Sequence, residues 1–164
     1  MAKVVFQLGD NVSTDVIYPG RFMATVLPTE TPQFAFADYP EFNAAIEQKQ
    51  IPAGSVIVAG KNFGCGSSRE QAASCLRGPD LVVIAKGFAR IFFQNAINLG
   101  LKTIICPEIA AQVDDELEIS SEVVINRSSG QQFRITPLPP ARQAIINAGG
   151  LIPYTRQRLL ERKK

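Results

Sequence analysis

Short apolar runs alternate with helical patterns through the middle of the chain. Residues 55–59 and 81–85 are almost wholly apolar, as expected for strands with both faces covered, and residues 102–106 follow as a third strand. Between these runs, residues 68–77 and 88–99 carry apolar positions at helical spacing, and a glycine follows each of them. The pattern predicts a parallel β-α-β-α-β unit whose strand-to-helix loops lie at one edge of the sheet.

The regions on either side of this unit follow other patterns. The expected elements there are a first strand (3–8), a polar turn (10–15), a loop (21–28), a connection (31–39), a helix (40–48), three short strands (116–119, 122–126 and 132–136) and a helix (141–148). The last two strands are expected to form a hairpin through a Ser-Ser-Gly turn. We therefore expect an α/β fold in one domain over residues 1–164, with an added antiparallel lobe.

The segment between the first apolar run and the helix after it holds the main candidate chemistry. Residues 64–66 read Gly-Cys-Gly, and the two glycines allow backbone angles that are closed to other residues. Ser67, Ser68 and Arg69 follow at the expected helix start, where free backbone N–H groups and the helix dipole favour negative charge. The sequence therefore indicates an anion site beside a potential nucleophile or base.

The start of that helix can be interpreted in two registers. Ser67 with Glu70 fits the capping box, and Ser68 with Gln71 fits it equally well. A plain helix cap without any chemistry is the alternative interpretation of the same residues. Arg69 in the first turn opposes the helix dipole, so it needs a compensating anion, which a bound carboxylate would supply.

Composition narrows the choice of chemistry. The chain has 164 residues, a net charge of +2 and no histidine, which removes Ser-His-Asp and Cys-His catalysis within the chain. Its three cysteines are widely spaced and contain no C-x-x-C pair, so neither a zinc site nor a redox dithiol is indicated. Cys65 is expected to pack rather than react, because no base lies near it in the sequence.

Charge and hydropathy bear on partners and location. A net charge of +2 is too small to indicate nucleic-acid binding, and the basic residues 156–164 read as a solvated terminal helix. The mean hydropathy is +0.06, and no apolar segment is long enough for a signal peptide or a membrane span. We therefore expect a cytoplasmic protein with no nucleic-acid or membrane partner.

Three motifs resemble one known family. They read GDNVSTDVIYPGR at 9–21, NFGCGSSRE at 62–70 and IAKGFARIFFQNAINLGL at 84–101. Their order and spacing are similar to those of the swivelling domain of the aconitase superfamily, and in particular to the separate small subunits of the 3-isopropylmalate dehydratases. The resemblance implies a swivelling β/β/α domain of the aconitase type. One departure is Gln71, because many relatives have histidine at that position.

The resemblance also implies a reaction and roles for residues. In the family, a hydro-lyase isomerises 2-isopropylmalate and 3-isopropylmalate by dehydration and rehydration, a step of leucine biosynthesis. Carried over by position, Ser67 is the base, Arg69 the clamp for a substrate carboxylate, and Ser68 an auxiliary donor to the substrate. The loop that selects the substrate side chain corresponds to Phe22, Met23, Ala24 and Thr25, which contain no arginine.

The resemblance places the cofactor on another chain. Family members use a [4Fe–4S] cluster, and the cysteines of this sequence do not match the cluster motif. The cluster is therefore expected on a separate large subunit, in a heterodimer or heterotetramer, and no metal is expected on this chain. The substrate class is a small hydroxy-dicarboxylate.

Two alternative functions are consistent with the same residues. One is a related hydro-lyase small subunit for another branched acid, of the dimethylmalate, citramalate or homoaconitate type, since the 22–25 segment departs from the usual pattern. The absence of a cation there makes homoaconitate the weaker choice. The other is a non-catalytic module that binds an anion on the glycine-rich loop, although neither nucleotide-binding glycine motif is present.

Overall fold

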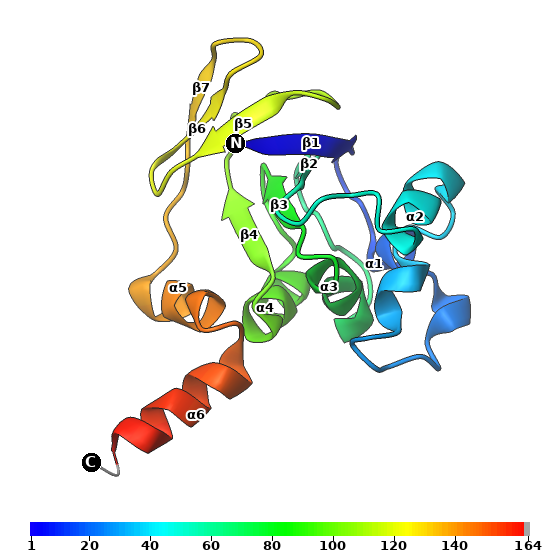
Figure 1. The fold of residues 1–164 in the computed structure, drawn as a ribbon, viewed down its shortest axis with the longest axis vertical. Coiled ribbons are helices and arrows are strands. Elements are labelled where there is room, and N and C mark those ends of the chain that lie inside the picture. The colour runs from blue at the N-terminus through cyan, green and yellow to red at the C-terminus, as the bar shows by residue number, and fades with distance from the viewer. Residues whose placement is uncertain (163–164) are drawn as a thin grey trace.

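In the computed structural model, which describes residues 1–162, seven strands form one mixed sheet in the order β4-β3-β2-β1-β5-β6-β7 (Figure 1). The strands are β1 (Ala2–Gln7), β2 (Val56–Ala59), β3 (Val82–Ala85), β4 (Lys102–Ile105), β5 (Glu116–Ile119), β6 (Val123–Asn126) and β7 (Gln132–Arg134). Strands β1 to β4 pair in parallel, whereas β5 to β7 pair antiparallel and join the sheet through β1. The parallel unit, the antiparallel lobe and the hairpin are all confirmed.

Helices α3 (Glu70–Arg77) and α4 (Arg90–Leu99) connect the parallel strands. They pack side by side on one face of β2 to β4, as Figure 1 shows. Every residue of β2 and β3 is buried, which explains their continuous apolar sequence. Both helices begin two residues later than the sequence pattern predicts, so the loops before them are longer and more irregular.

The parallel strands contribute to two hydrophobic cores. Along β2, Ile57 and Ala59 pack beneath the helices, whereas Val56 and Val58 face the other side of the sheet. This division follows from the alternation of side chains along a strand. The antiparallel lobe covers the second face with side chains that include Leu117 and Val124. The sheet therefore curls so that its own strands cover the face that carries no helix.

The region between β1 and β2 is more ordered than the sequence predicts. The polar turn expected at 10–15 contains the start of a one-turn helix, α1 (Thr14–Ile17), capped by the Ser13 hydroxyl, which accepts from the backbone N–H of Val16 at 3.3 Å. Residues Gly20–Phe22 and Thr31–Phe34 form 3₁₀ turns where a loop and a connection were expected. The expected helix is present as α2 (Pro40–Glu47). Single turns of helix are too short to show a period in the sequence, which is why they were missed.

The end of the described chain forms two helices, α5 (Pro140–Asn147) and α6 (Leu151–Glu161). Helix α6 buries none of its side chains and projects from the body in Figure 1. It confirms the solvated helix expected at 156–164, although it begins five residues earlier, and Lys163 and Lys164 lie outside the described residues. Within residues 1–162, no helix is both long and apolar enough to cross a membrane.

Candidate active site

The glycine-rich loop at 60–69 leaves the carboxyl end of β2 and is anchored by Phe63. This side chain is fully buried and meets the ring of Phe92 on α4 edge-on, with ring centroids 5.2 Å apart. The Phe63 backbone N–H donates to the carbonyl of Gly87 at 3.0 Å, and its carbonyl accepts from Ala89 at 2.9 Å. The loop is therefore tied to the chain that follows β3.

Gly64 is required by packing as well as by backbone conformation. It has a φ of +84°, and a Cβ added there would lie 2.2 Å from Cγ of Phe92. Its N–H donates to the carbonyl of Val12 at 2.7 Å, and the N–H of Thr14 donates to the carbonyl of Cys65 at 2.7 Å. The segments around residues 13 and 65, which are far apart in the sequence, thus lie side by side.

Ser67 is exposed and contacts Thr14, a buried residue at the start of α1. The Ser67 backbone N–H donates to Thr14 Oγ1 at 3.1 Å, and the two hydroxyl oxygens are 3.3 Å apart. Ser68 is also exposed, and its carbonyl accepts from Nδ2 of Asn95 on α4 at 3.4 Å. Both hydroxyls lie at the surface of a loop whose backbone is held from two sides.

Neither serine caps the helix. Helix α3 begins at Glu70, and its N-cap residue is Arg69, in an extended conformation and without a side-chain capping hydrogen bond. Both capping-box interpretations are therefore wrong. The physical reason is tertiary, because the Ser67 N–H is bound to Thr14 and the Ser68 carbonyl to Asn95. As a result, neither hydroxyl is used for capping.

Arg69 has the compensating anion that its position requires, and Asp15 of α1 provides it. The Arg69 side chain is only 14% exposed, and its Nη1 forms an ion pair with Oδ1 of Asp15. Nη1 also donates to the carbonyl of Tyr18 at 3.2 Å, and a Cβ added to Gly20 would lie 3.3 Å from Nη2. The buried Nε has no hydrogen-bond partner among the described residues. The guanidinium is thus enclosed by α1 and the turn after it, with donor capacity still unused.

The segment expected to select the substrate side chain lies beside this arginine. Phe22 is half-buried and stacks on Phe34, with ring centroids 4.2 Å apart. Met23 and Ala24 are exposed, and the Met23 carbonyl accepts from Nε2 of Gln71 at 3.3 Å. Because Gln71 is two residues after Arg69, the structure brings this segment next to the first turn of α3, with Met23 and Ala24 as its outward-facing side chains.

Several residues of this region were missed from the sequence. Each makes a tertiary contact with part of the site. Thr14 and Asn95 contact the loop, Tyr18 contacts Arg69, and Gln71 contacts the 22–25 segment. Thr14 lies in a motif that the sequence marks out, but the polar pattern there reads equally well as a structural corner. Asn95 interrupts an apolar helix, a signal that could be read as pointing at the site or as simple solvation, and its contact with Ser68 supports the first interpretation.

The cysteines do not form a metal-binding group. Cys75 and Cys106 are buried in separate hydrophobic cores, and Cys65 is half-buried in the loop. Burial, with a smaller contribution from Glu108, raises the pKa of Cys106 to about 11, and burial raises the pKa of Cys75 well above its usual range. Among residues 1–162, no three side chains of the metal-binding types lie together. The donor set of this chain does not fit an iron–sulfur cluster.

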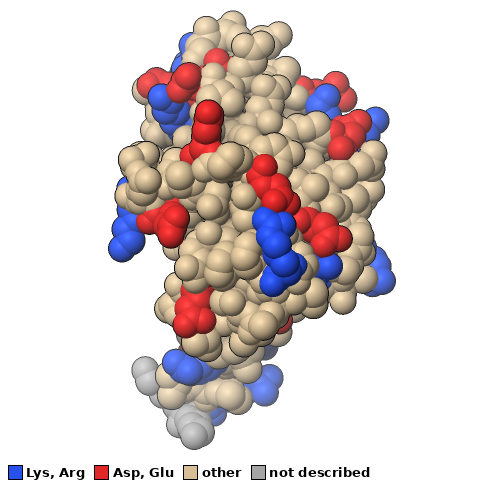
Figure 2. Space-filling model, turned by 90° about the vertical axis from the view of Figure 1, so that its right-hand side faces the viewer, with Lys and Arg blue, Asp and Glu red and all other residues tan. Residues whose placement is uncertain are grey.

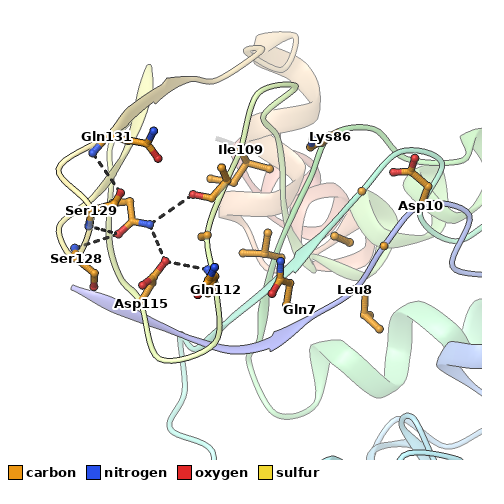
Figure 3. Close-up of a pocket in the computed structure, with 17 residues that line it drawn as sticks. Gln7, Leu8, Asp10, Lys86, Ile109, Gln112, Asp115, Ser128, Ser129 and Gln131 are labelled. Atoms are coloured by element: carbon orange, nitrogen blue, oxygen red, sulfur yellow. Dashed lines mark hydrogen bonds between the residues drawn. The ribbon is translucent and has the colours of Figure 1, made fainter.

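A polar cavity of about 560 Å³ lies near the carboxyl ends of β1 and β2, and neither Ser67 nor Arg69 lines it (Figure 3). Its hydrogen bonds connect Asn126 of β6 to Asp115 and to the hairpin turn, which gives them a structural role. The serines lie instead on an open surface. Across the face drawn in Figure 2, basic and acidic side chains are interspersed, in keeping with the small net charge.

Comparison with known proteins yields one family. The family model of the aconitase C-terminal domain matches residues 17–108. The 3-isopropylmalate dehydratase small subunit of Methanosarcina mazei is 42% identical over 163 residues, covering 96% of this chain and 97% of that protein. The 2,3-dimethylmalate dehydratase small subunit of Eubacterium barkeri is 44% identical over 155 residues, covering 92% and 93%. The crystal structure of a 3-isopropylmalate dehydratase chain from Methanocaldococcus jannaschii superposes with a TM-score of 0.87 at 37% identity, covering 98% and 96%.

Proposed function

The chain belongs to the aconitase C-terminal domain family, together with the small subunits of the 3-isopropylmalate dehydratases, and on this basis we propose that it is the small subunit of a hydro-lyase that interconverts 2-isopropylmalate and 3-isopropylmalate. The reaction is a dehydration followed by a rehydration, and it serves leucine biosynthesis. The swivel fold of this family is the fold observed here.

One observation carries the assignment of residues. Ser67 contacts Thr14 while Arg69 pairs with the next residue, Asp15, so that a hydroxyl and a guanidinium lie over the same turn of α1. A carboxylate bound by Arg69 would therefore place its neighbouring carbon near Ser67. We assign Ser67 as the base that removes the proton from that carbon.

A serine hydroxyl is a weak base unless its alkoxide is stabilised. The stabilisation can come from backbone N–H groups, a nearby cation and the exclusion of water. Arg69, two residues further on, is the proposed cation, and the exposed position of Ser67 leaves the exclusion of water to a partner. We propose that the large subunit covers this surface and that the chain alone is inactive.

Arg69 is the proposed carboxylate clamp, since a guanidinium binds a carboxylate through two parallel hydrogen bonds. Asp15 orients it, Ser68 donates a hydrogen bond to substrate, and the 22–25 segment contacts the substrate branch. Within that segment Phe22 packs inward on Phe34, so Met23, Ala24 and Thr25 are the proposed contacts with the branch.

The [4Fe–4S] cluster is proposed to reside on the large subunit, because the cysteines of this chain are dispersed. When bound there, it supplies a Lewis acid for the departing hydroxyl group. The contribution of this chain is to bind the carboxylate and to move the proton at Ser67 Oγ.

The test is Ser67→Ala in the enzyme reconstituted with its large subunit. We expect kcat to fall by about a hundredfold or more, in the range found when a general base is removed, with little change in thermal stability. Ser121→Ala is the matched control, because Ser121 is also exposed and lies in the β5–β6 turn, distant from Ser67 in the sequence. Turnover of the Ser67→Ala enzyme at the wild-type rate would remove Ser67 from the mechanism.

A second candidate is the same chemistry on another branched acid. The Eubacterium barkeri relative is named for 2,3-dimethylmalate and is 44% identical, against 42% for the Methanosarcina mazei relative, so overall identity does not separate the two substrates. Turnover of 3-isopropylmalate, 2,3-dimethylmalate and citramalate by the reconstituted enzyme decides between them. A non-catalytic anion module would instead show phosphate-dependent thermal stabilisation without any partner.

A further inference from the structure

Tyr18 connects the two parts of the proposed substrate site. It follows α1 directly, its side chain is fully buried, and its backbone carbonyl accepts a hydrogen bond from Arg69 Nη1 at 3.2 Å. Its side-chain hydroxyl is directed at the 22–25 segment instead, where it lies 3.1 Å from the carbonyl oxygen of Phe22 and 3.2 Å from that of Thr25. One residue thus contacts the guanidinium through its backbone and the 22–25 segment through its side chain.

The two carbonyls bracket Met23 and Ala24. The segment is a tight turn, in which the Met23 N–H donates to Gly20 at 3.2 Å and the Thr25 N–H donates to Phe22 at 2.9 Å. Two of its carbonyls converge on the phenol inside the turn, while the side chains of Met23 and Ala24 are exposed. The phenol is therefore placed to fix how far these apolar side chains stand from the molecule.

The turn begins close to the arginine. A Cβ added to Gly20 would lie 3.3 Å from Arg69 Nη2, so there is little room for a side chain between the start of the turn and the guanidinium. Burial raises the pKa of Tyr18 above its ordinary value, so the phenol stays protonated and remains a donor throughout the neutral range. The hydroxyl can therefore act as the tether throughout the neutral range.

We infer that Tyr18 is a positioning residue that fixes the spacing between Arg69 and the exposed Met23–Ala24 pair, and through it the size of the apolar branch that a bound hydroxy-dicarboxylate can carry. The inference rests on the proposed function, because it assumes that Arg69 binds the substrate carboxylate. Gln71 adds a second, exposed tether to the Met23 carbonyl at 3.3 Å. Loss of either tether lets the pair move and relaxes the selection between branches.

The experiment compares Tyr18→Phe with wild type in the reconstituted enzyme, with 3-isopropylmalate and citramalate as substrates. The variant keeps the buried ring and removes only the hydroxyl. We expect the ratio of kcat/KM for the two acids to change at least fivefold, mainly through KM, with kcat for the better substrate within twofold. Tyr39→Phe is the matched control, since Tyr39 is partly exposed and packs through its ring.

A second variant and a second measurement keep the inference open to refutation if Tyr18→Phe folds poorly. Gln71→Ala, at the surface, should change the same ratio in the same direction by a smaller factor. Amide hydrogen exchange of the isolated full chain should show faster exchange over residues 20–27 in Tyr18→Phe than in wild type. An unchanged substrate ratio, or a fall in kcat alone, overturns the inference. Failure of the wild-type enzyme to turn over either acid refutes the proposed function instead.

Discussion

At the scale of single residues, the surroundings of Arg69 decide what the loop can do. The side chain is largely enclosed, yet it carries more donors than its contacts with Asp15 and Tyr18 use. An enclosed arginine with a fixed plane is suited to a planar, bidentate ligand, whereas a lysine at the same place would offer a single point charge. If Arg69 binds the substrate as proposed, its guanidinium shape should therefore matter as well as its charge.

Arg69→Lys tests that distinction in the reconstituted enzyme. We expect KM for the dicarboxylate to rise about tenfold, with a smaller effect on kcat, because a bidentate contact is replaced by one that retains only the charge. Steady-state kinetics checks the split between the two constants. Arg77→Lys, at the other end of α3, is the control, and equal KM values for the two variants would contradict the clamp role of Arg69.

At this scale the sequence predicted which side chains share the loop surface but not their local geometry. Ser67, Ser68 and Arg69 lie together at the surface, as their adjacency requires. Their backbone, however, is determined by Thr14 and Asn95, which are 53 and 27 residues away in the sequence. The capping box is a local rule, and it failed here because distant partners bind the same backbone groups.

At the scale of elements, the loop packs closely against helix α4 at Gly64. Gly64 lies against the Phe92 ring in a left-handed conformation, so neither space nor backbone conformation allows a side chain there. Any change at this position moves the loop relative to α4. The glycine-rich sequence is thus explained by packing as much as by ligand access.

Gly64→Ala should therefore cost more than a change in backbone preference alone. We expect the free energy of unfolding to fall by about 3 kcal/mol, from overpacking against Phe92 added to the strain of a positive φ. Gly130→Ala is the matched control, because Gly130 has a φ of +77° with no atom near the added Cβ, and we expect a loss of about 1 kcal/mol there. Equal losses in urea titrations of the two variants would contradict the packing argument.

Elements with a clear period were predictable, and short elements were not. The continuous apolar runs of β2 and β3 identified buried parallel strands because the two cores cover both of their faces. Helix α1 and the two 3₁₀ turns have only three or four residues each, which is too few for a repeating hydrophobic pattern to show in the sequence. Thr14, Asp15, Phe22 and Phe34, which contact the candidate site residues or belong to them, lie on these short elements, so their contacts could not be predicted.

At the scale of the whole molecule, the antiparallel lobe is held to the rest by polar as well as apolar contacts. Asn126 of β6 is fully buried, and its Nδ2 donates to Asp115 Oδ2 at 2.7 Å. Asp115 also accepts from the backbone N–H of Gln112 at 2.8 Å. The pKa of Asp115 lies below its ordinary value, mainly because the Gln112 N–H donates a hydrogen bond to its carboxylate and secondly because Asn126 does the same. The charged form of this carboxylate is thus stabilised only in the folded protein.

The stability of the molecule should depend on pH accordingly. Because the pKa of Asp115 is lower in the folded than in the unfolded state, its contribution is fully present above the unfolded value of 3.8 and is lost as pH falls through the folded value. We expect the urea midpoint of wild type to fall below about pH 4 more steeply than that of Asp115→Asn. The other carboxylates are shared by both proteins, so parallel curves would contradict the assignment to Asp115.

The order of the sheet was beyond the reach of the sequence pattern. Strand β1 lies between β2 and β5, although the segments that pair with it are separated from it by about 50 and 110 residues. The hydrophobic pattern identifies a strand but does not predict which strands pair with it, because pairing between distant segments leaves no local signal in the sequence.

This placement of β1 has a consequence for biosynthesis. Strand β1 is translated before the other six strands and ends up inside the sheet, so its second edge stays open until β5 has been translated. A nascent chain stalled before residue 116 would expose that edge to other chains. Cotranslational folding should therefore be completed late, well after the loop at 60–69 has been made.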